Sequence, residues 1–170
     1  MIDEVAVHDA TGRYGRAAVA AGRAAAALDA PLLNASQLFT VLWRAGDIPA
    51  ASWPAPAGVA AARDHLEGAR RLLVGAAPSA GDGRLCVAEL EHGIRLALLG
   101  ADVLDLGRGG LHRLDPGGAA ALRDRLDGLI AEQRALWLLR SRPGGLDDSI
   151  SRLRPLRRVL ERRAAAADAG

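Results

Sequence analysis

The sequence predicts an all-α fold, a helical bundle of about five or six helices joined by turns rich in glycine and proline. Apolar residues recur every three or four positions over long stretches, which is the period of a helix buried on one side. Glycine and proline clusters separate these stretches, and no segment alternates clearly between apolar and polar residues. Half of the residues are apolar but only 3% are aromatic, so the core must consist mainly of Leu, Ala and Val.

The length of 170 residues predicts a single helical domain over residues 1–170, with a disordered tail at residues 164–170. A chain of this size buries roughly 70% of the surface that its unfolded form exposes, so it needs no disulfide or metal to hold its core together. Trp43, Trp53 and Trp137 are expected to be the few large side chains of that core.

Three helices are predicted in the first half of the chain. The first covers residues 11–28 and is ended by a proline that cannot continue it. The second is short and lies between the capping candidates Asn34 and Ser36 and the breaker Gly46. After a proline-rich connector, the third helix covers residues 58–77.

Three more helices are predicted in the second half. The fourth runs from about Gly83 to near Gly100, and the fifth, which is the longest, covers residues 116–141. Asp115 is followed by proline, which is typical of a helix start. Pro155 either kinks the last helix or makes it begin again.

The segment RALWLLRSRPGGLDDS, residues 134–149, predicts a sharp corner between two helices. Its proline bars helix continuation, and the two glycines let the backbone reverse. The acidic and hydroxyl side chains after them can cap the exposed amides of a new helix. We expect the tryptophan to anchor the helices and the arginines to bond carboxylates or helix-end carbonyls. The predicted corner residues are Trp137, Arg140, Arg142, Pro143, Gly144, Gly145, Asp148 and Ser149.

No catalytic, cofactor or metal site is predicted. Glu89 and His92 have the E-x-x-H spacing of di-iron carboxylate bundles, but such a site needs a second copy and further glutamates that the chain lacks. His92 is therefore expected to be a surface or interface histidine. Cys86 lies among apolar neighbours and is expected to be a small core residue.

The best strand candidate is VAVHD at residues 5–9. Together with the glycine turn and helix after it, this segment is similar to the opening of a dinucleotide-binding fold such as that of the dihydrodipicolinate reductases, where helix-start amides hold phosphate. No apolar second strand follows that helix, so the sequence favours the all-α fold.

The charges suggest one further class of partner. Arginine supplies all 22 basic residues against 20 acidic ones, which is typical of a GC-rich genome and leaves a net charge of +2. Six arginines among residues 152–163 could bind a polyanion. The same segment carries an apolar stripe, so its arginines become the exposed face of a docking helix and nucleic-acid binding is not favoured. The stripe consists of Ile150, Leu153, Leu156 and Leu160.

The expected location is the cytoplasm. No segment is long and apolar enough to cross a membrane, and the amino terminus lacks the basic-then-apolar pattern of a secretion signal. A single cysteine, Cys86, fits either a reducing compartment or a cysteine-poor secreted protein.

The corner also resembles a known family. ALWLLRSRPGGLDDSISRL, residues 135–153, resembles the closing helical junction of bacterial family 20 glycoside hydrolases, the β-N-acetylhexosaminidase-like group. APLLNASQLFTVL, residues 30–42, is similar to a stretch that follows the barrel in such chains. Together the two segments cover less than a fifth of the sequence. The resemblance implies a role in carbohydrate metabolism, in which an adjacent Asp-Glu pair on a (β/α)8 barrel hydrolyses terminal N-acetylhexosamines.

This chain is too short for a barrel of about 250 residues. Its one Asp-Glu dipeptide, Asp3 and Glu4, lies at the chain end. The resemblance therefore implies a non-catalytic accessory domain that packs against or supports a sugar-hydrolase barrel. The alternative is a free-standing helical module for protein interaction or oligomerisation. The expected partners are a catalytic barrel in the same chain, another protein, or a second copy of this chain.

Overall fold

The computed structural model describes residues 7–29, 36–45, 53–108 and 110–166, and within them it confirms the all-α fold. These ranges contain seven α-helices, one short 3₁₀ turn and no strand. The helices are α1 (Arg13–Ala26), α2 (Gln37–Trp43), α3 (Pro56–Val74), α4 (Gly83–Leu106), α5 (Pro116–Arg140), α6 (Leu146–Ser151) and α7 (Arg154–Ala165), with the 3₁₀ turn η3 at Leu111–Arg113.

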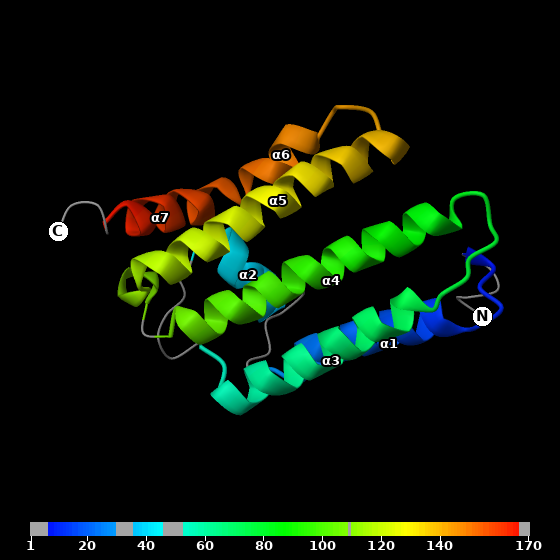
Figure 1. The fold of residues 1–170 in the computed structure, drawn as a ribbon, viewed down its shortest axis with the longest axis horizontal. Coiled ribbons are helices and arrows are strands. Elements are labelled where there is room, and N and C mark those ends of the chain that lie inside the picture. Colours follow the sequence, from blue (N-terminus) through cyan, green and yellow to red (C-terminus); the bar gives the residue numbers. More distant parts are fainter. Residues whose placement is uncertain (1–6, 30–35, 46–52, 109, 167–170) are drawn as a thin grey trace.

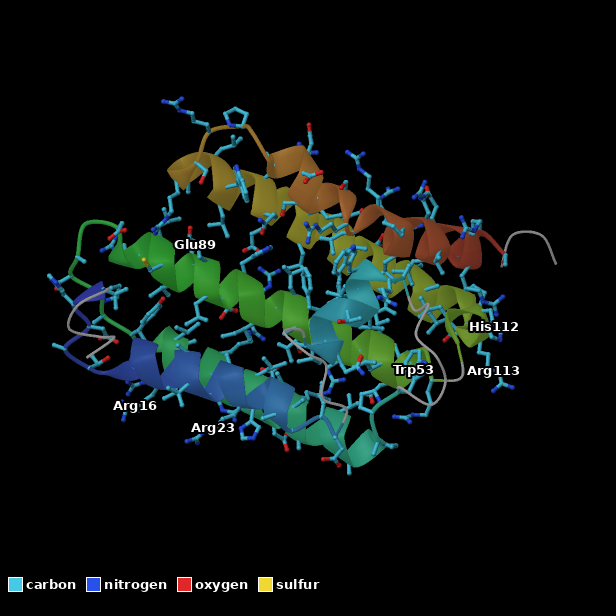
Figure 2. The ribbon with its side chains drawn as sticks, turned by 180° about the vertical axis from the view of Figure 1, so that it is seen from behind. Arg16, Arg23, Trp53, Glu89, His112 and Arg113 are labelled. Atoms are coloured by element: carbon cyan, nitrogen blue, oxygen red, sulfur yellow. The ribbon has the colours of Figure 1, made fainter. Side chains whose placement is uncertain are left out.

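The long helices form an antiparallel array (Figure 1). Helix α1 packs on α3, α3 on α4, α4 on α5, and α5 on α7. Helix α2 crosses α4 on the far side of this view, so it lies in front when the molecule is seen from behind (Figure 2). In the part of the chain that the structure describes, no helix has both the length and the apolar character needed to cross a membrane.

There are more helices than predicted because the last one is divided. Helix α6 ends at Ser151, and α7 begins at Arg154. Pro155 therefore lies in the first turn of α7, where the missing N–H of proline is tolerated. Helix α7 also continues through Ala164 and Ala165, which the sequence places in a disordered tail; residues 167–170 of that tail lie outside the described residues.

The predicted end of helix α4 near Gly100 is wrong, because the helix continues to Leu106. Gly100 is a packing position, because a Cβ there would overlap the backbone carbonyl of Leu38 in α2. The absent side chain lets α2 cross α4 at close range. Ala101 and Val103, just beyond the glycine, are fully buried, so the apolar face of the helix continues past it.

The dinucleotide-binding alternative is contradicted at its first element. Of the candidate strand at residues 5–9, residues 7–9 are described, and they form only an isolated bridge between Asp9 and Pro78. Residues 5 and 6 lie outside the described part. Within the described residues this segment is held by hydrogen bonds of the Asp9 side chain and by those that the carbonyls of Val7 and His8 accept from residues 79 and 80.

The buried carboxylate of Asp9 joins the start of α1 to the loop after α3. It accepts hydrogen bonds from the Thr11 N–H and hydroxyl, the Tyr14 N–H and the Ala77 N–H, at 2.6 to 3.2 Å. Burial by itself would raise the pKa of Asp9. The hydrogen bonds favour the ionised form more strongly, so the pKa of this carboxyl lies far below its ordinary value.

The core is aliphatic, as predicted, but Trp43 and Trp137 lie outside it, and only Trp53 of the three tryptophans packs against it. Trp43 is 47% exposed, and the guanidinium of Arg152 lies over its ring at 5.0 Å from the centroid. Trp53 and Trp137 are partly buried. Trp43 comes at the end of the short helix α2, whose opposite face packs on α4, so its ring is left at the surface.

Helix α7 docks on α5 through the predicted apolar stripe. The guanidinium of Arg157 binds the carboxylate of Asp127 in α5 at 2.6 Å, and Arg163 binds the backbone carbonyl of Leu114. Two arginines of the tail therefore hold the helix in place, while Arg154 and Arg158 are exposed. The buried stripe residues are Ile150, Leu153, Leu156 and Leu160.

Candidate functional site

The corner between α5 and α6 is closed by Trp137. Its indole N–H donates a hydrogen bond to the carbonyl of Arg142 at 2.9 Å, so the loop folds back on the last turns of α5. Gly145 takes a left-handed conformation with φ of 83°, which glycine adopts at little cost. Pro143 and Gly144, between Arg142 and Gly145, form the exposed tip of the loop. The reversal is where the sequence predicts it, although its polar contacts differ in part.

The two corner arginines have different surroundings. The guanidinium of Arg140 contacts Glu89 at 3.1 Å, Asp82 at 3.5 Å and the sulfur of Cys86 at 3.3 Å, all on or beside the start of α4. The bond to Cys86 and the nearby carboxylate of Glu89 raise the pKa of Arg140. The Arg142 guanidinium makes no hydrogen bond or ion pair within the described residues, and this residue contributes its carbonyl instead.

Asp148 and Ser149 do not cap α6. The capping position falls on Gly145, and no side chain accepts a hydrogen bond from the first amides of the helix. Both residues come after the first helical residue, so their side chains are free for other contacts. Both line a hollow against α2 and α4.

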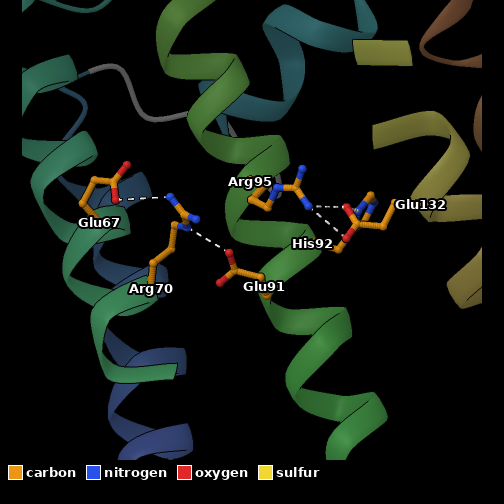
Figure 3. A network of polar contacts seen from close by, with 6 residues as sticks. All are labelled: Glu67, Arg70, Glu91, His92, Arg95 and Glu132. Carbon is orange, nitrogen blue, oxygen red and sulfur yellow. Dashed lines mark hydrogen bonds and ion pairs between the residues drawn. The ribbon is translucent and has the colours of Figure 1, made fainter. Parts of the chain in front are cut away.

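The two residues of the E-x-x-H pair make separate contacts, and Figure 3 shows those of His92. Glu89 binds Arg140, whereas the imidazole Nδ1 of His92 lies 2.9 Å from a carboxylate oxygen of Glu132 in α5. Arg95 donates to both oxygens of the same carboxylate at 2.9 Å. Because both oxygens of that carboxylate already accept from Arg95, we assign Nδ1 as the donor and the carboxylate as the acceptor in the His92 contact.

His92 is a buried interface residue. Its side chain is 5% exposed, and its Nε2 has no hydrogen-bond partner within the described ranges. Three or more metal-ligating side chains do not come together in those ranges. Cys86 is only partly buried, contrary to the core position predicted for it, and its sulfur accepts a hydrogen bond from the guanidinium of Arg140 instead of packing among apolar side chains.

A charged cleft of about 570 Å³ lies between α3, α4 and α5. Four arginines line it, and each is paired with at least one carboxylate. Burial disfavours the charge of Arg63, but its hydrogen bonds to Asp105 and Asp102 outweigh burial and raise its pKa. The cleft is therefore an ion-pair network, and its arginines are already neutralised. The four are Arg63, Arg70, Arg95 and Arg125.

The opposite side of α4 carries an apolar hollow of about 380 Å³ between α1, α2 and α4. Ser36 is the one polar residue among the described residues that line it. Gly22 and Gly93 leave part of the space open, because a Cβ at either would meet no atom within 4 Å. Phe39, at the edge of the hollow, is 43% exposed. We call this region the apolar hollow.

A second hollow of about 340 Å³ adjoins the first and shares Phe39 and Leu96 with it. We call it the corner hollow, because several predicted corner residues line it: Trp137, Gly145, Asp148 and Ser149. Phe39, Gln133 and Arg152 also line it, and none of the three is among the predicted site residues. Gln133 lies one helical turn before Trp137, and that spacing could have indicated a shared face.

The loop that carries Trp53 and the turn-rich segment around η3 lie at the end of the bundle away from Glu89 (Figure 2). Trp53 lies there beside His112 and Arg113 of η3. Arg108 donates to the carbonyl of Pro54 at 3.2 Å, which joins the two loops. Residue 109 and residues 46–52 lie outside the described part of the chain.

Comparison with known proteins finds no matching family model, no matching curated protein and no matching solved structure. What the chain does must therefore be argued from its own surfaces.

Proposed function

We propose that this chain is a non-catalytic helical accessory domain that docks on a protein partner through the apolar hollow. One observation carries the proposal: an apolar depression with open space at Gly22 and Gly93 lies beside an exposed Phe39. Exposed concave apolar surfaces of this kind are typical of sites that receive a partner's side chain.

The charged cleft supports a stabilising role over a catalytic one. Its arginines are bound by carboxylates, which leaves no unpaired cation to hold an anionic substrate. The one buried histidine, His92, lies in the α4–α5 interface beside Glu132. These groups join helices to one another, and such cross-helix pairs rigidify a bundle.

The partner that we propose is a catalytic sugar-hydrolase barrel in the same polypeptide. The support is the resemblance of residues 135–153 to the closing junction of family 20 glycoside hydrolases. The structure forms a helical reversal within that segment, with Trp137 bound to Arg142. A domain of this kind would contribute to stability and leave the chemistry to the barrel.

The alternative is a free-standing module that pairs with a second copy through the same hollow. The two functions differ in a direct observation. A reading frame that encodes a (β/α)8 barrel together with this segment supports the accessory domain. A frame without one, combined with a stable dimer in sedimentation velocity, overturns that proposal and supports the module.

Docking itself is tested by filling the hollow. Gly93→Leu adds a side chain where the structure has open space, so it should block docking without unfolding the bundle. Gly128→Leu is the matched control, since it also adds a side chain to open space on a helix but lines the charged cleft. We expect Gly93→Leu to weaken binding to the purified barrel by about tenfold or more. Equal effects of the two variants would contradict docking at this hollow.

The non-catalytic assignment has its own test. The purified chain should not hydrolyse a chromogenic N-acetylglucosaminide. Hydrolysis that disappears when a carboxylate of this chain is replaced by its amide would overturn the assignment, because a contaminating enzyme would be insensitive to that substitution.

A further inference from the structure

The corner hollow combines an apolar floor with a polar rim. Phe39 of α2, Leu96 of α4 and Trp137 of α5 belong to its apolar lining, which we call the floor, and the volume of about 340 Å³ is within the range of small-ligand sites. Trp137 is fixed in place, since its indole N–H is bound to the Arg142 carbonyl. A rigid aromatic side chain in a concave site is suited to stacking against a ring.

The rim consists of polar side chains that have unused hydrogen-bonding capacity. Gln133, Asp148, Ser149 and Arg152 all line the hollow. None of these four side chains has a hydrogen-bond or ion-pair partner within the described residues, apart from the stacking of Arg152 on Trp43. The charged cleft on the other side of the molecule differs in this respect, because its arginines are bound by carboxylates.

The rim charges disfavour a ligand with a net charge of either sign. One cation, Arg152, and one anion, Asp148, lie on the same hollow, so a free anion or a free cation would be attracted by one and repelled by the other. The amide of Gln133 and the hydroxyl of Ser149 each offer both a donor and an acceptor. A ligand with several hydroxyl groups can use all four side chains, because each hydroxyl donates one hydrogen bond and accepts others.

From this arrangement we propose that the corner hollow binds the pyranose ring of a neutral sugar. The C–H face of the ring stacks on Trp137 and Phe39, and its hydroxyls bind Gln133, Asp148 and Arg152. The stacking of Arg152 on Trp43, at 5.0 Å, holds the guanidinium at the rim. The proposal does not rest on the docking function, which uses the neighbouring apolar hollow, and either can fail without the other.

The test is a titration of the full ¹⁵N-labelled chain with methyl glycosides of glucose, galactose, mannose and N-acetylglucosamine, followed by heteronuclear NMR. We expect at least one sugar to shift the indole N–H of Trp137 and the side-chain amide of Gln133 in a saturable manner. Adenosine is titrated in parallel, because a nucleobase is the other neutral ring that could stack on these aromatics. Saturation by adenosine and not by any sugar would overturn the proposal.

Paired variants then locate the site. Asp148→Asn should weaken binding of the responding sugar by about tenfold, whereas Asp147→Asn, one residue earlier on α6 and outside the hollow, should leave it unchanged. Arg152→Met and the exposed control Arg154→Met form a second pair. Gln133→Met removes polar atoms at nearly constant shape and should also weaken binding. Absence of saturable shifts with every sugar, or equal effects within each pair, would refute a sugar site here.

Discussion

Asp9 shows how one buried carboxylate can organise a chain end. It accepts hydrogen bonds from Thr11, Tyr14 and Ala77, so it joins the first turn of α1 to the loop between α3 and α4. An asparagine at this position would keep one acceptor oxygen. Its NH₂ group would replace the other oxygen, and an NH₂ group cannot accept a hydrogen bond from a backbone N–H. This difference makes the contribution of Asp9 measurable.

Asp9→Asn should lower the free energy of unfolding at pH 7 by about 2 kcal/mol, because backbone donors lose a charged acceptor. The pKa of Asp9 is depressed in the folded state, so its contribution is present above the unfolded pKa of about 4 and is lost as the pH falls below that value. Urea unfolding of both proteins at pH 7 and pH 3 tests this. Asp29→Asn, at an exposed position, serves as the control. A difference in the free energy of unfolding between the wild type and Asp9→Asn that does not shrink from pH 7 to pH 3 would contradict this prediction.

Two glycines of α4 should respond to alanine in opposite directions. At Gly93 a Cβ meets nothing, so Gly93→Ala should stabilise by about 1 kcal/mol through helix propensity. At Gly100 the new Cβ would overlap the Leu38 carbonyl, so Gly100→Ala should destabilise by about 1 to 3 kcal/mol as α2 is displaced. Denaturant unfolding measures both. Two changes of the same sign would show that α2 does not pack on α4 at Gly100.

At the scale of elements, the α5–α6 reversal depends on one backbone conformation. Gly145 has φ of 83°, whereas the neighbouring Gly144 does not have a positive φ, and a Cβ on Gly144 would meet nothing. A Cβ on Gly145 would make ordinary contact with Trp137 at 3.5 Å, so the cost of alanine there is conformational and not steric.

Gly145→Ala should therefore destabilise the protein by about 1 to 2 kcal/mol, and Gly144→Ala should be close to neutral. Thermal unfolding of the two variants tests the difference. If Gly145→Ala and Gly144→Ala unfold at the same midpoint temperature, the reversal between α5 and α6 does not depend on the left-handed conformation of Gly145.

At the scale of the whole molecule, the ion pairs limit how positive the surface is. The net charge is +2, and the arginines of the charged cleft have carboxylate partners. We expect the protein to elute from immobilised heparin below physiological salt, because its 22 arginines are nearly balanced by 20 carboxylates and the net charge of +2 attracts a polyanion only weakly. Retention beyond physiological salt, lost on replacing Arg154, Arg158 and Arg162 of α7 by glutamine, would instead indicate a polyanion site.

Much of the fold could be predicted from the sequence because apolar period and helix breakers act locally. The stripe of α7 and the cap of α5 by Asp115 are of this kind. The prediction that the helix ends near Gly100 is wrong because the sequence does not distinguish a glycine that ends a helix from one that allows close packing. The close approach of Leu38, which only the structure shows, identifies Gly100 as a packing glycine. The exposure of Trp43 likewise depends on how α2 crosses α4.

The candidate sites were mostly beyond sequence reasoning. The corner hollow joins Phe39 of α2 to Gln133 of α5 and to Arg152 in the junction between α6 and α7, and no local pattern brings them together. The partner of His92, Glu132, is forty positions away along the chain. Such pairings are decided by helix packing, whereas the glycine reversal between α5 and α6 is decided within a few residues.

Helix α4 has contacts with α1, α2, α3 and α5, so it is shared by both halves of the array. If α1 and α3 separate from it, α5 still covers its other side, and the reverse holds when α5 to α7 move. The backbone amides of α4 should accordingly exchange with deuterated solvent more slowly than those of any other helix. The two flanking groups of helices can then fluctuate independently, each leaving the hydrogen bonds of the central helix intact.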